Sequence, residues 1–402
     1  MRAVWVTRSF LDYRVPVYSA LSSLLEKQLA VIYNAEAVPE RAQSKLRAAL
    51  GDNAIGLTGE RCLGPNVVVN RAANSTIRLP WQPGLLREVC RHKPEVLISD
   101  GFFQWTAAAL WSRVKYGVPH VLCYERTAHT ERNAQWYRRL YRKWALRYVD
   151  AMCCNGRLCR EYAEGFGMAA ERITCGHMAA DTYGLKAALN SVTPGAVQDL
   201  RCRFDLSGTC LLYVGRLTVR KGLWQLLTAW SRLEPSSASR ASVLLVGCGS
   251  ERTRLESFCQ ANHLTNVHFV GAVDYDNLAP YYAAADAFVI PTLEDNWSLV
   301  VPEAMTCGLP VLCSKYNGCW PELVQEGRNG WVFDPLSPAD MLRCLEECLR
   351  SKTRLASMGQ ESLALVRDHT PKKAAAAVFE ACRLALAARS PARIVSPVQD
   401  AR

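Results

Sequence analysis

Runs of apolar residues alternate with amphipathic stretches through most of the chain. Short apolar runs predict strands, and stretches with apolar residues three and four positions apart predict helices. In the first half the predicted strands are 3–7, 95–99, 119–124 and 151–154, and helices are predicted from Pro16 and over 106–116, 132–148 and 158–165. Strands that alternate with helices favour a parallel sheet with helices on both faces.

The same alternation restarts after a break at 190–209, where Ser, Thr, Pro and Gly accumulate. Further strands are predicted at 211–214, 242–246, 267–270, 287–290 and 310–313. We therefore expect an α/β protein with two doubly wound domains: residues 1–190, a linker at 191–209, a second domain at 210–375, and a final helix and tail at 376–402. Ligands of such sheets bind at the carboxyl ends of the strands, so the site is expected between the domains.

Composition and charge narrow the class of protein. Of 402 residues, 50% are hydrophobic and 21% are charged, which provides a sizeable core and excludes disorder as the main state. The net charge is +11, and residues 1–190 carry +10 of it, with 26 basic and 16 acidic side chains. A positive charge concentrated in the first half of the chain attracts anionic lipid, a phosphorylated carrier or nucleic acid. A merely soluble basic surface explains the charge equally well.

The chain also indicates a compartment. No run approaches the roughly 18–20 apolar residues that span a bilayer, and the first residues, interrupted by Arg8, are typical of a strand rather than a signal peptide. The 17 cysteines are scattered, and none has the CxxC spacing of a zinc or redox site. They predict small buried side chains in a reducing compartment, so we expect a cytoplasmic protein without a metal ion.

The densest polar signal follows the predicted strand 211–214. Gly215 ends this strand, and Arg216 and Lys221 lie in the turn before the next helix. A glycine at a strand end lets a ligand approach the backbone, and two cations there can bind a diphosphate. A pair of exposed loop cations without a ligand is the alternative.

A second signal lies in residues 291–310, where an apolar strand runs into acidic and amide side chains. Ser298 is a good helix N-cap, and the free N–H groups of the helix start would form an anion site. Asp295 and Glu303 are eight positions apart and are expected to face one pocket. Beside a phosphate site, ionised carboxylates suit the hydroxyl groups of a ribose or another sugar, which donate to them.

Together these motifs resemble the donor-binding half of the family-4 retaining glycosyltransferases. The matching residues are Gly215-Arg216, Lys221-Gly222, Asp295 and Glu303 in the pattern D-x7-E, Asn317 to Glu322, and Asn329-Gly330. The detailed resemblance covers about 211–335, and the first half is similar mainly in the order of its strands and helices. The resemblance implies the GT-B fold, in which two Rossmann-like domains face each other.

The resemblance also implies roles. Arg216 and Lys221 would hold the nucleotide diphosphate and stabilise the leaving group, and Glu303 would bind the ribose. Asp295 replaces the family's first Glu, which contacts the transferred sugar, and Glu294 is the rival if the backbone shifts by one residue. The family often continues with Gly-Phe-Gly, whereas this chain has Asn-Trp-Ser, which would reshape the sugar pocket. The expected donor-binding residues are Gly215, Arg216, Lys221, Asp295, Asn296, Trp297, Ser298, Leu299 and Glu303.

In the first half, the family often places a functional histidine after the strand that corresponds to 119–124, near the sugar and the acceptor. His129 is that candidate, with a solvated loop histidine as the alternative, and it joins Arg216, Lys221 and Asp295 as the expected catalytic residues. Glu125 and His129 are the expected acceptor-side residues, together with Arg14, which stands where many relatives have a Gly-rich loop.

Three further patterns point to other functions. Asp274-Tyr-Asp276 spells a metal-binding DxD but precedes a predicted helix, so we interpret it as a helix cap. Gly247-Cys-Gly249 lacks the third glycine of the dinucleotide fingerprint, which argues against a nicotinamide oxidoreductase. In the basic helix 132–148, Trp136, Leu140 and Trp144 share one face, as in helices that lie on anionic membranes. We expect instead that this face packs on the sheet, because the βαβ pattern needs a packed helix.

We therefore expect a metal-independent, retaining glycosyltransferase that moves a hexosyl group from a nucleotide-diphosphate sugar to an acceptor hydroxyl, in polysaccharide or glycolipid synthesis. No cofactor is expected beside this co-substrate. The expected partners are a sugar or lipid-linked acceptor and an anionic membrane, at whose inner face the cytoplasmic protein would be peripheral, and no nucleic acid. The alternatives are a sugar phosphorylase or epimerase of the same fold, and a non-catalytic subunit that binds nucleotide sugar or membrane.

Overall fold

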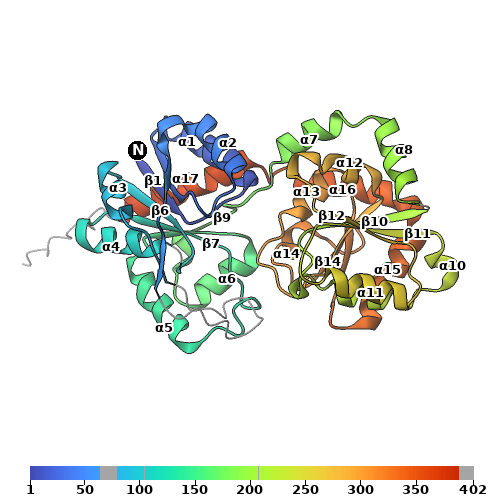
Figure 1. Cartoon of the computed structure of the whole chain (residues 1–402). Coiled ribbons are helices and arrows are strands. Elements are labelled where there is room, and N and C mark those ends of the chain that lie inside the picture. Colours follow the sequence, from blue (N-terminus) through green and yellow to red (C-terminus); the bar gives the residue numbers. More distant parts are fainter. Residues whose placement is uncertain (64–78, 104, 207, 389–402) are drawn as a thin grey trace, which may run out of the picture.

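The computed structural model describes residues 1–63, 79–103, 105–206 and 208–388, and it has two lobes side by side (Figure 1). The first lobe is built on a seven-stranded parallel sheet. Its strands, in order across the sheet, are β3 (Ala54–Leu57), β2 (Leu29–Asn34), β1 (Ala3–Thr7), β6 (Val96–Asp100), β7 (His120–Tyr124), β8 (Ala151–Cys154) and β9 (Ile173–Cys175). A short antiparallel hairpin of β4 (Arg61–Leu63) and β5 (Leu79–Trp81) stands apart from this sheet.

Helices cover both faces of the first sheet because successive residues of a strand point to opposite sides. In β1, Trp5 packs in the core with α1 and α2, whereas Val4 and Val6 pack in the core with α3 and α4. The helices of this lobe are α1 (Val15–Leu24), α2 (Glu40–Leu50), α3 (Leu85–Arg91), α4 (Thr106–Tyr116), α5 (Trp136–Ala145) and α6 (Arg157–Gly165).

The second lobe contains a six-stranded parallel sheet. Across the sheet its strands are β12 (Val267–Gly271), β11 (Ala241–Val246), β10 (Thr209–Val214), β13 (Ala287–Ile290), β14 (Val311–Ser314) and β15 (Gly330–Phe333). Its helices are α7 (Thr182–Asn190), α8 (Pro194–Arg203), α9 (Leu223–Trp230), α10 (Pro235–Ala238), α11 (Arg252–Ala261), α12 (Ala279–Ala284), α13 (Val300–Thr306), α14 (Trp320–Leu323), α15 (Pro338–Arg350) and α16 (Leu355–Val366).

The two sheets share one topology, and the expected pair of doubly wound, Rossmann-like domains of the GT-B type is confirmed. In each sheet the strand order reverses beside the first strand of the domain, between β1 and β6 in the first and between β10 and β13 in the second. Open α/β sheets bind ligands outside the carboxyl ends of the strands at this reversal. The fold therefore offers one binding position in each lobe.

Some elements were not predicted from the pattern of apolar residues. The strand β2 is a fully buried run, and periodicity alone does not separate such a run from a helix. The strands β9 and β15 have only three and four residues. The stretch expected to link the domains contains α8, which Thr193 caps by accepting a hydrogen bond from the Ala196 N–H (3.2 Å), with Pro194 in the first turn. Thus Ser, Thr and Pro mark a helix start here.

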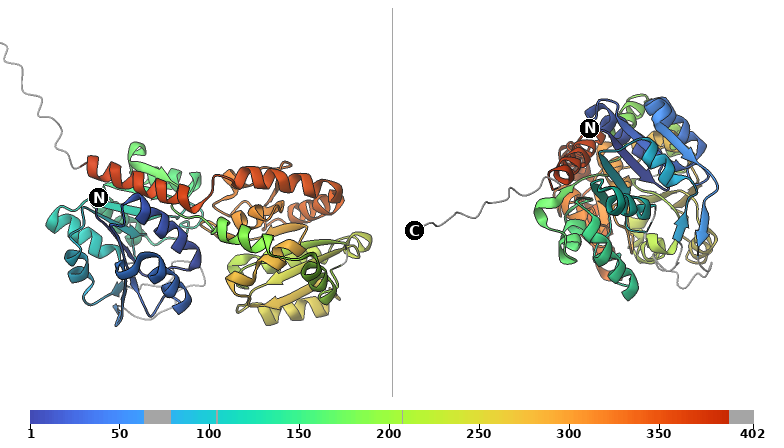
Figure 2. Two further views of the ribbon diagram at one scale, coloured as in Figure 1. Left: turned by 90° about the horizontal axis from the view of Figure 1, so that it is seen from above. Right: turned by 90° about the vertical axis from the view of Figure 1, so that its left-hand side faces the viewer.

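The last helix, α17 (Pro371–Ala387), returns from the second lobe to the first and lies along α1 (Figure 2). Its buried residues are small and complete the core of the first lobe: Ala374, Ala375, Val378, Ala381, Cys382 and Ala385. The expected final helix therefore packs on the first lobe, although it follows the second lobe in the sequence. The end of the expected tail, residues 389–402, lies outside the described residues.

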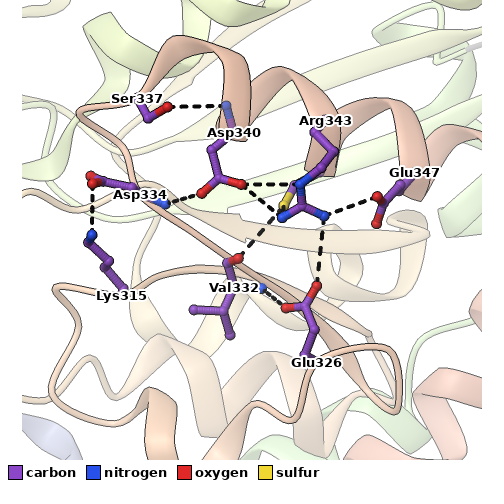
Figure 3. A network of polar contacts seen from close by, with 9 residues as sticks. Lys315, Glu326, Val332, Asp334, Ser337, Asp340, Arg343 and Glu347 are labelled. Carbon is purple, nitrogen blue, oxygen red and sulfur yellow. Dashed lines mark hydrogen bonds and ion pairs between the residues drawn. The ribbon is translucent and has the colours of Figure 1, made fainter.

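A charged network fixes the edge of the second sheet (Figure 3). Arg343 of α15 contacts Asp340 (2.8 Å), Glu347 (3.0 Å) and Glu326 (3.9 Å). Asp340 also accepts a hydrogen bond from the Asp334 N–H (2.8 Å) after β15, and Asp334 pairs with Lys315 (2.8 Å) after β14. The network ties α15 to β15 and to the start of the loop that follows β14.

The expectation that the aromatic face of α5 packs on the sheet is wrong. Trp136, Leu140 and Trp144 are 72%, 57% and 47% exposed. The buried face is instead made by Arg138, Arg142 and Ala145. Arg142 lies 2.6 Å from the buried carboxylate of Glu131, and both arginines stack on the ring of Phe103. A paired guanidinium can be buried, so the large apolar side chains remain on the outside. In the described part of the chain, no helix is long and apolar enough to cross a bilayer.

Candidate functional site

Two loops at the carboxyl ends of the neighbouring strands β10 and β13 form the centre of the site. The first loop runs from Gly215 through the 3₁₀ turn Val219–Lys221 to α9, and the second covers 291–299. The Leu293 N–H and the Thr292 hydroxyl both donate to the Arg220 carbonyl, at 2.8 and 3.0 Å. These bonds hold the two loops together.

Gly222 makes this contact between the loops possible. Its φ of +67° is unfavourable for other residues, and a Cβ atom there would lie 1.9 Å from the Pro291 carbonyl oxygen. The glycine of the Lys221-Gly222 motif therefore serves close packing of the two loops, next to the lysine.

Lys221 and Asp295 meet at the centre of this pair of loops. The Lys221 ammonium donates to Asp295 Oδ2, which also accepts from the Ser298 hydroxyl (2.6 Å), and Oδ1 accepts from the Trp297 N–H (3.3 Å). Burial alone would raise the pKa of Asp295, but Lys221 and these hydrogen bonds outweigh it and lower the pKa, so the carboxylate is ionised. Glu294, the rival, instead pairs with Arg132 of the first lobe (3.3 Å).

The helix after this loop starts later than predicted. The first residue of α13 is Val300, Leu299 occupies the N-cap position, and no side chain caps the helix. The expectation that Ser298 is the N-cap is wrong: its hydroxyl accepts no N–H of α13 and donates to Asp295. Trp297 and Leu299, expected to bind the donor, are buried in the core of the second lobe.

Glu303 lies inside α13 and is 3% exposed. The Tyr282 hydroxyl of α12 donates to its Oε2 (2.9 Å). Burial raises the pKa of Glu303 to about 7, although Tyr282 and Tyr275 partly oppose this shift. The two tyrosines were missed from the sequence, since nothing in their spacing relates them to α13.

Arg216 is exposed, and its side chain has no ion pair in the described part of the chain. Its carbonyl accepts a hydrogen bond from the Tyr213 hydroxyl of β10 (2.9 Å), which fixes the backbone just after Gly215. A Cβ atom at Gly247 would lie 1.9 Å from the Gly215 carbonyl oxygen. The Gly247-Cys-Gly249 pattern thus lets two strand-end loops pack, which accounts for it without a dinucleotide.

The segment from Asn317 to Glu322 positions the second loop, 291–299. The Gly318 N–H donates to the Asp295 carbonyl (3.1 Å), and Asn317 Oδ1 accepts from the Ser298 N–H (3.4 Å). A Cβ atom at Gly318 would lie 1.7 Å from the Asn296 carbonyl oxygen. These residues of the family motif therefore act through the shape of the loop around Asp295.

From the first lobe, His129 and Glu125 contact the second loop, 291–299. His129 Nε2–H donates to the Leu293 carbonyl (2.9 Å), and its ring stacks on Tyr316 with centroids 4.2 Å apart. Burial lowers the pKa of His129, so the imidazole is neutral near pH 7. The Asn296 side-chain amide donates to Glu125 Oε1 (3.4 Å). Sequence reasoning missed Tyr316, which follows β14 without any motif of its own.

Arg14, the third acceptor-side candidate, lies deeper in the first lobe. It is buried, 2.7 Å from Asp100 Oδ1 at the end of β6, and its Nη1 donates to His177 Nδ1 (3.2 Å). It lines a cavity at the strand reversal of the first sheet, together with Glu125. Arg14 and Glu125 therefore line one cavity of the first lobe, whereas Lys221 belongs to the second lobe.

The Asp274-Tyr-Asp276 pattern was interpreted wrongly as a helix cap. Neither side chain caps a helix. Asp276 lies 3.0 Å from Lys45, and Asp274 lies 3.7 Å from Arg41. Lys45 and Arg41 belong to α2 of the first lobe. The carboxylates therefore form ion pairs between the lobes. Within the described ranges, no group of three or more His, Cys, Asp and Glu side chains has the arrangement of a metal site.

Two family models match the chain. Residues 203–363 match "Glycosyl transferases group 1", and residues 39–182 match "Glycosyltransferase Family 4". D-inositol 3-phosphate glycosyltransferase 2 of Catenulispora acidiphila is 32% identical over 162 residues, 38% of either chain. D-inositol 3-phosphate glycosyltransferase of Rhodococcus opacus is 25% identical over 374 residues, 86% of this chain and 80% of that protein. Several curated relatives align over only 30% to 40% of their own length.

Solved structures share the whole fold. The crystal structure of Alr3699/HepE of Anabaena in complex with UDP superimposes with a TM-score of 0.72 at 17% identity, over 94% of this chain and 99% of that one. The similarity covers both lobes, which agrees with the two matched models on either side of residue 200.

Proposed function

Because the chain belongs to the family-4 glycosyltransferases and has their GT-B fold, we propose that it transfers a hexosyl group from a nucleotide-diphosphate sugar to an acceptor hydroxyl with retention of configuration. The donor would lie on the loops after β10 and β13, with Arg216 and Lys221 at the diphosphate and Glu303 at the ribose. The acceptor would lie on the first lobe, beside Glu125 and His129.

In this proposal the sugar C1–O bond to the diphosphate breaks and a C1–O bond to the acceptor forms on the same face. The acceptor proton goes to an oxygen of the departing diphosphate, so no protein nucleophile is needed. Arg216 and Lys221 stabilise the charge that develops on the leaving group, a role that a metal ion fills in other enzymes. Asp295 holds Lys221 before the donor arrives and is placed to accept from a sugar hydroxyl.

One observation carries the proposal: the ionised Lys221–Asp295 pair and the exposed Arg216 lie at the strand reversal of the second sheet. There, a cation held by a single carboxylate is available to a diphosphate. Arg216 lies on the same loop, next to Gly215. Two guanidinium or ammonium contacts to phosphate would each contribute about 1.5–3 kcal/mol.

The test is nucleotide binding in EDTA, measured by thermal shift and calorimetry with nucleoside diphosphates and their glucose conjugates. UDP is the first probe, because Alr3699/HepE was crystallised in complex with UDP. A ligand at a hundredfold excess over its Kd stabilises the fold by about 2.7 kcal/mol. Arg216→Ala should lose at least tenfold in affinity without loss of stability.

Arg220→Ala is the matched control, since Arg220 is an exposed cation of the same turn. Equal losses in both variants would mean that only the general positive charge matters, and would overturn the assignment of Arg216. Absence of binding by any nucleotide would favour a non-catalytic subunit that binds membrane. Release of sugar 1-phosphate that depends on added phosphate, or donor isomerisation without an acceptor, would identify a phosphorylase or an epimerase.

The outer face of α5 supports a membrane partner. Its exposed Trp136, Leu140 and Trp144 follow each other at helical spacing, and the exposed cations Arg139, Lys143 and Arg147 lie among them. No acidic residue occurs between positions 132 and 149. We propose that this face rests on an anionic membrane surface, where each basic residue contributes about 1 kcal/mol and the indoles enter the interface.

Vesicle co-sedimentation tests this partner. Binding is expected with vesicles that contain anionic lipid and not with purely zwitterionic ones, and Trp136→Ser with Trp144→Ser should abolish it. Trp81→Ser is the control, because Trp81 is a 50% exposed tryptophan of β5. No binding to anionic vesicles, or an equal effect of the control, would contradict the proposal.

A further inference from the structure

The start of α6 in the first lobe lies next to α14 of the second lobe, at the junction of the two lobes (Figure 1). Gly156 occupies the N-cap position of α6 and has no side chain to cap the helix. The Arg157 N–H, which has no partner within the helix, donates instead to Glu322 Oε1 of α14. A carboxylate is favourable there, because the N-terminus of a helix carries partial positive charge. The second lobe thus supplies a cap to a helix of the first.

Gly156 also allows a close fit between the lobes. Its φ of +80° lies in the region that favours glycine. A Cβ atom there would lie 2.4 Å from Cζ3 of the Trp297 indole and 3.0 Å from Glu322 Oε1. Trp297 itself is 7% exposed and packs in the core of the second lobe. Trp297 and Glu322, seated on Gly156 and the Arg157 N–H, form an interlobe socket.

The two second-lobe residues of the socket belong to the segments that place Asp295. The Trp297 N–H donates to Asp295 Oδ1 (3.3 Å). Glu322 ends the segment in which the Gly318 N–H donates to the Asp295 carbonyl (3.1 Å). A movement of α6 relative to the second lobe would therefore displace both segments that hold Asp295.

A cavity of about 390 Å³ adjoins the interlobe socket. It is lined by Gly156, Trp297 and Glu322 and by residues of the two segments that connect the lobes, within 175–179 and 368–374. Over this volume the connecting segments are not packed against the socket. The direct contact of α6 with Trp297 and Glu322 therefore sets the local distance between the lobes.

We propose that Trp297 and Glu322 are positioning residues that make the placement of Asp295 depend on the first lobe. With the socket formed, the second loop (291–299) holds Asp295 against Lys221. With the lobes apart, Trp297 and Glu322 lose their partners on α6, and nucleotide-sugar binding weakens. This consequence for binding rests on the proposed function, whereas the coupling of α6 to the second loop stands on contacts within the chain.

Amide hydrogen exchange on the intact chain tests the coupling without any ligand. Gly156→Ala sets a methyl group against the indole and should speed exchange of the Trp297 and Gly318 amides at least tenfold, although the change lies in the first lobe. Gly176→Ala is the matched control: its φ is +107°, it lines the same cavity, and nothing lies within 4 Å of its Cβ position. Unchanged exchange in Gly156→Ala, or equal acceleration in both variants, overturns the proposal.

Glu322→Ala tests the cap separately, and it decides if Gly156→Ala does not fold. It should speed exchange of the Arg157 and Gly318 amides at least tenfold, one in each lobe. Glu322→Gln, whose amide oxygen still accepts from the Arg157 N–H, should stay within threefold of the natural chain. Asp368→Ala is the control, because Asp368 is an exposed carboxylate at the same cavity. Equal effects of Glu322→Ala and Asp368→Ala overturn the role of Glu322.

UDP affinity, measured by calorimetry, is the second readout. Gly156→Ala and Glu322→Ala should each lose at least tenfold, and the two control variants should bind as the natural chain does. Faster amide exchange with unchanged UDP affinity would refute the role of the socket in binding. If the natural chain binds no nucleotide while the exchange results hold, the coupling stands and the proposed function fails.

Discussion

At the scale of single residues, the site contains carboxyl groups with opposite pKa shifts. Lys221 and two hydrogen bonds lower the pKa of Asp295, whereas burial beside two tyrosines raises that of Glu303 to about 7. The difference follows from the partners, because only Asp295 has a cation within reach. Asp295 is therefore ionised at neutral pH, whereas Glu303 titrates near it.

The raised pKa of Glu303 predicts a pH-dependent stability. Between about pH 4.5 and 7 the folded state keeps the proton that the unfolded state releases, so the free energy of unfolding falls as the pH rises through this window. A shift of this size corresponds to about 3 kcal/mol at most. Glu303→Gln should therefore be more stable than the natural chain at pH 8 and similar to it at pH 5.

Urea unfolding at four pH values between 5 and 8 measures this difference. The stability of Glu303→Gln relative to the natural chain should grow with pH and level off above about 7. A difference that does not change with pH would mean that the carboxyl group is ionised throughout.

At the scale of elements, the proposed donor site depends on the fit between the loops after β10 and β13. The Arg220 carbonyl accepts both bonds that join the loops, and Gly222 leaves room for the Pro291 carbonyl. Lys221 and Asp295 belong to different loops, so the distance between their side chains is set by the backbone contacts that join the loops. A small backbone change should therefore affect ligand binding strongly.

Gly222→Ala is predicted to separate the loops. The variant strains a φ of +67° and places a Cβ atom 1.9 Å from the Pro291 oxygen. We expect at least a tenfold loss in nucleotide affinity and a loss of about 1–3 kcal/mol in stability. Calorimetry with UDP and urea unfolding measure the two effects.

Gly327→Ala is a control with the same strain but without the overlap. Its φ is +70°, and nothing lies within 4 Å of the added Cβ position. It should lose about 1 kcal/mol of stability and keep its nucleotide affinity. If both variants bind UDP as the natural chain does, the fit between the loops does not control the site.

At the scale of the whole molecule, the last helix joins the two lobes. The chain leaves the first lobe before α7 and returns to it in α17, whose small residues fill the core of the first lobe. Ion pairs and the His129–Leu293 bond add direct contacts between the lobes. The hydrophobic core of the first lobe is therefore incomplete without α17.

Val378→Asp tests this dependence. The side chain of Val378 is fully buried in the first core, so a carboxylate there would be unpaired and should cost about 4 kcal/mol or more. Calorimetry should show that the first lobe unfolds at a lower temperature than the second, and UDP should raise only the later transition.

Ala376→Asp provides the comparison, since Ala376 is exposed on the same helix. It should unfold as the natural chain does. Equal unfolding of both variants and the natural chain would mean that α17 contributes little to the first lobe.

The sequence by itself determined the two parallel sheets, and it singled out the loops after β10 and β13 as the candidate site. Apolar runs alternate with helical periodicity, and motifs such as Lys221-Gly222 and D-x7-E are local in the chain. Local patterns also predicted β8 and β13 to the residue. Such features depend on short-range spacing, which a single sequence displays.

Only the tertiary structure decided which side chains meet. The partners of Glu303 (Tyr282), His129 (Tyr316) and Asp276 (Lys45) come from other elements, and no spacing relates them. The outward face of α5 follows from the burial of Arg142 against Glu131, which reverses the order expected from hydropathy. Long-range pairing sets these contacts, because the energy of a buried charge depends on the partner that the fold brings to it.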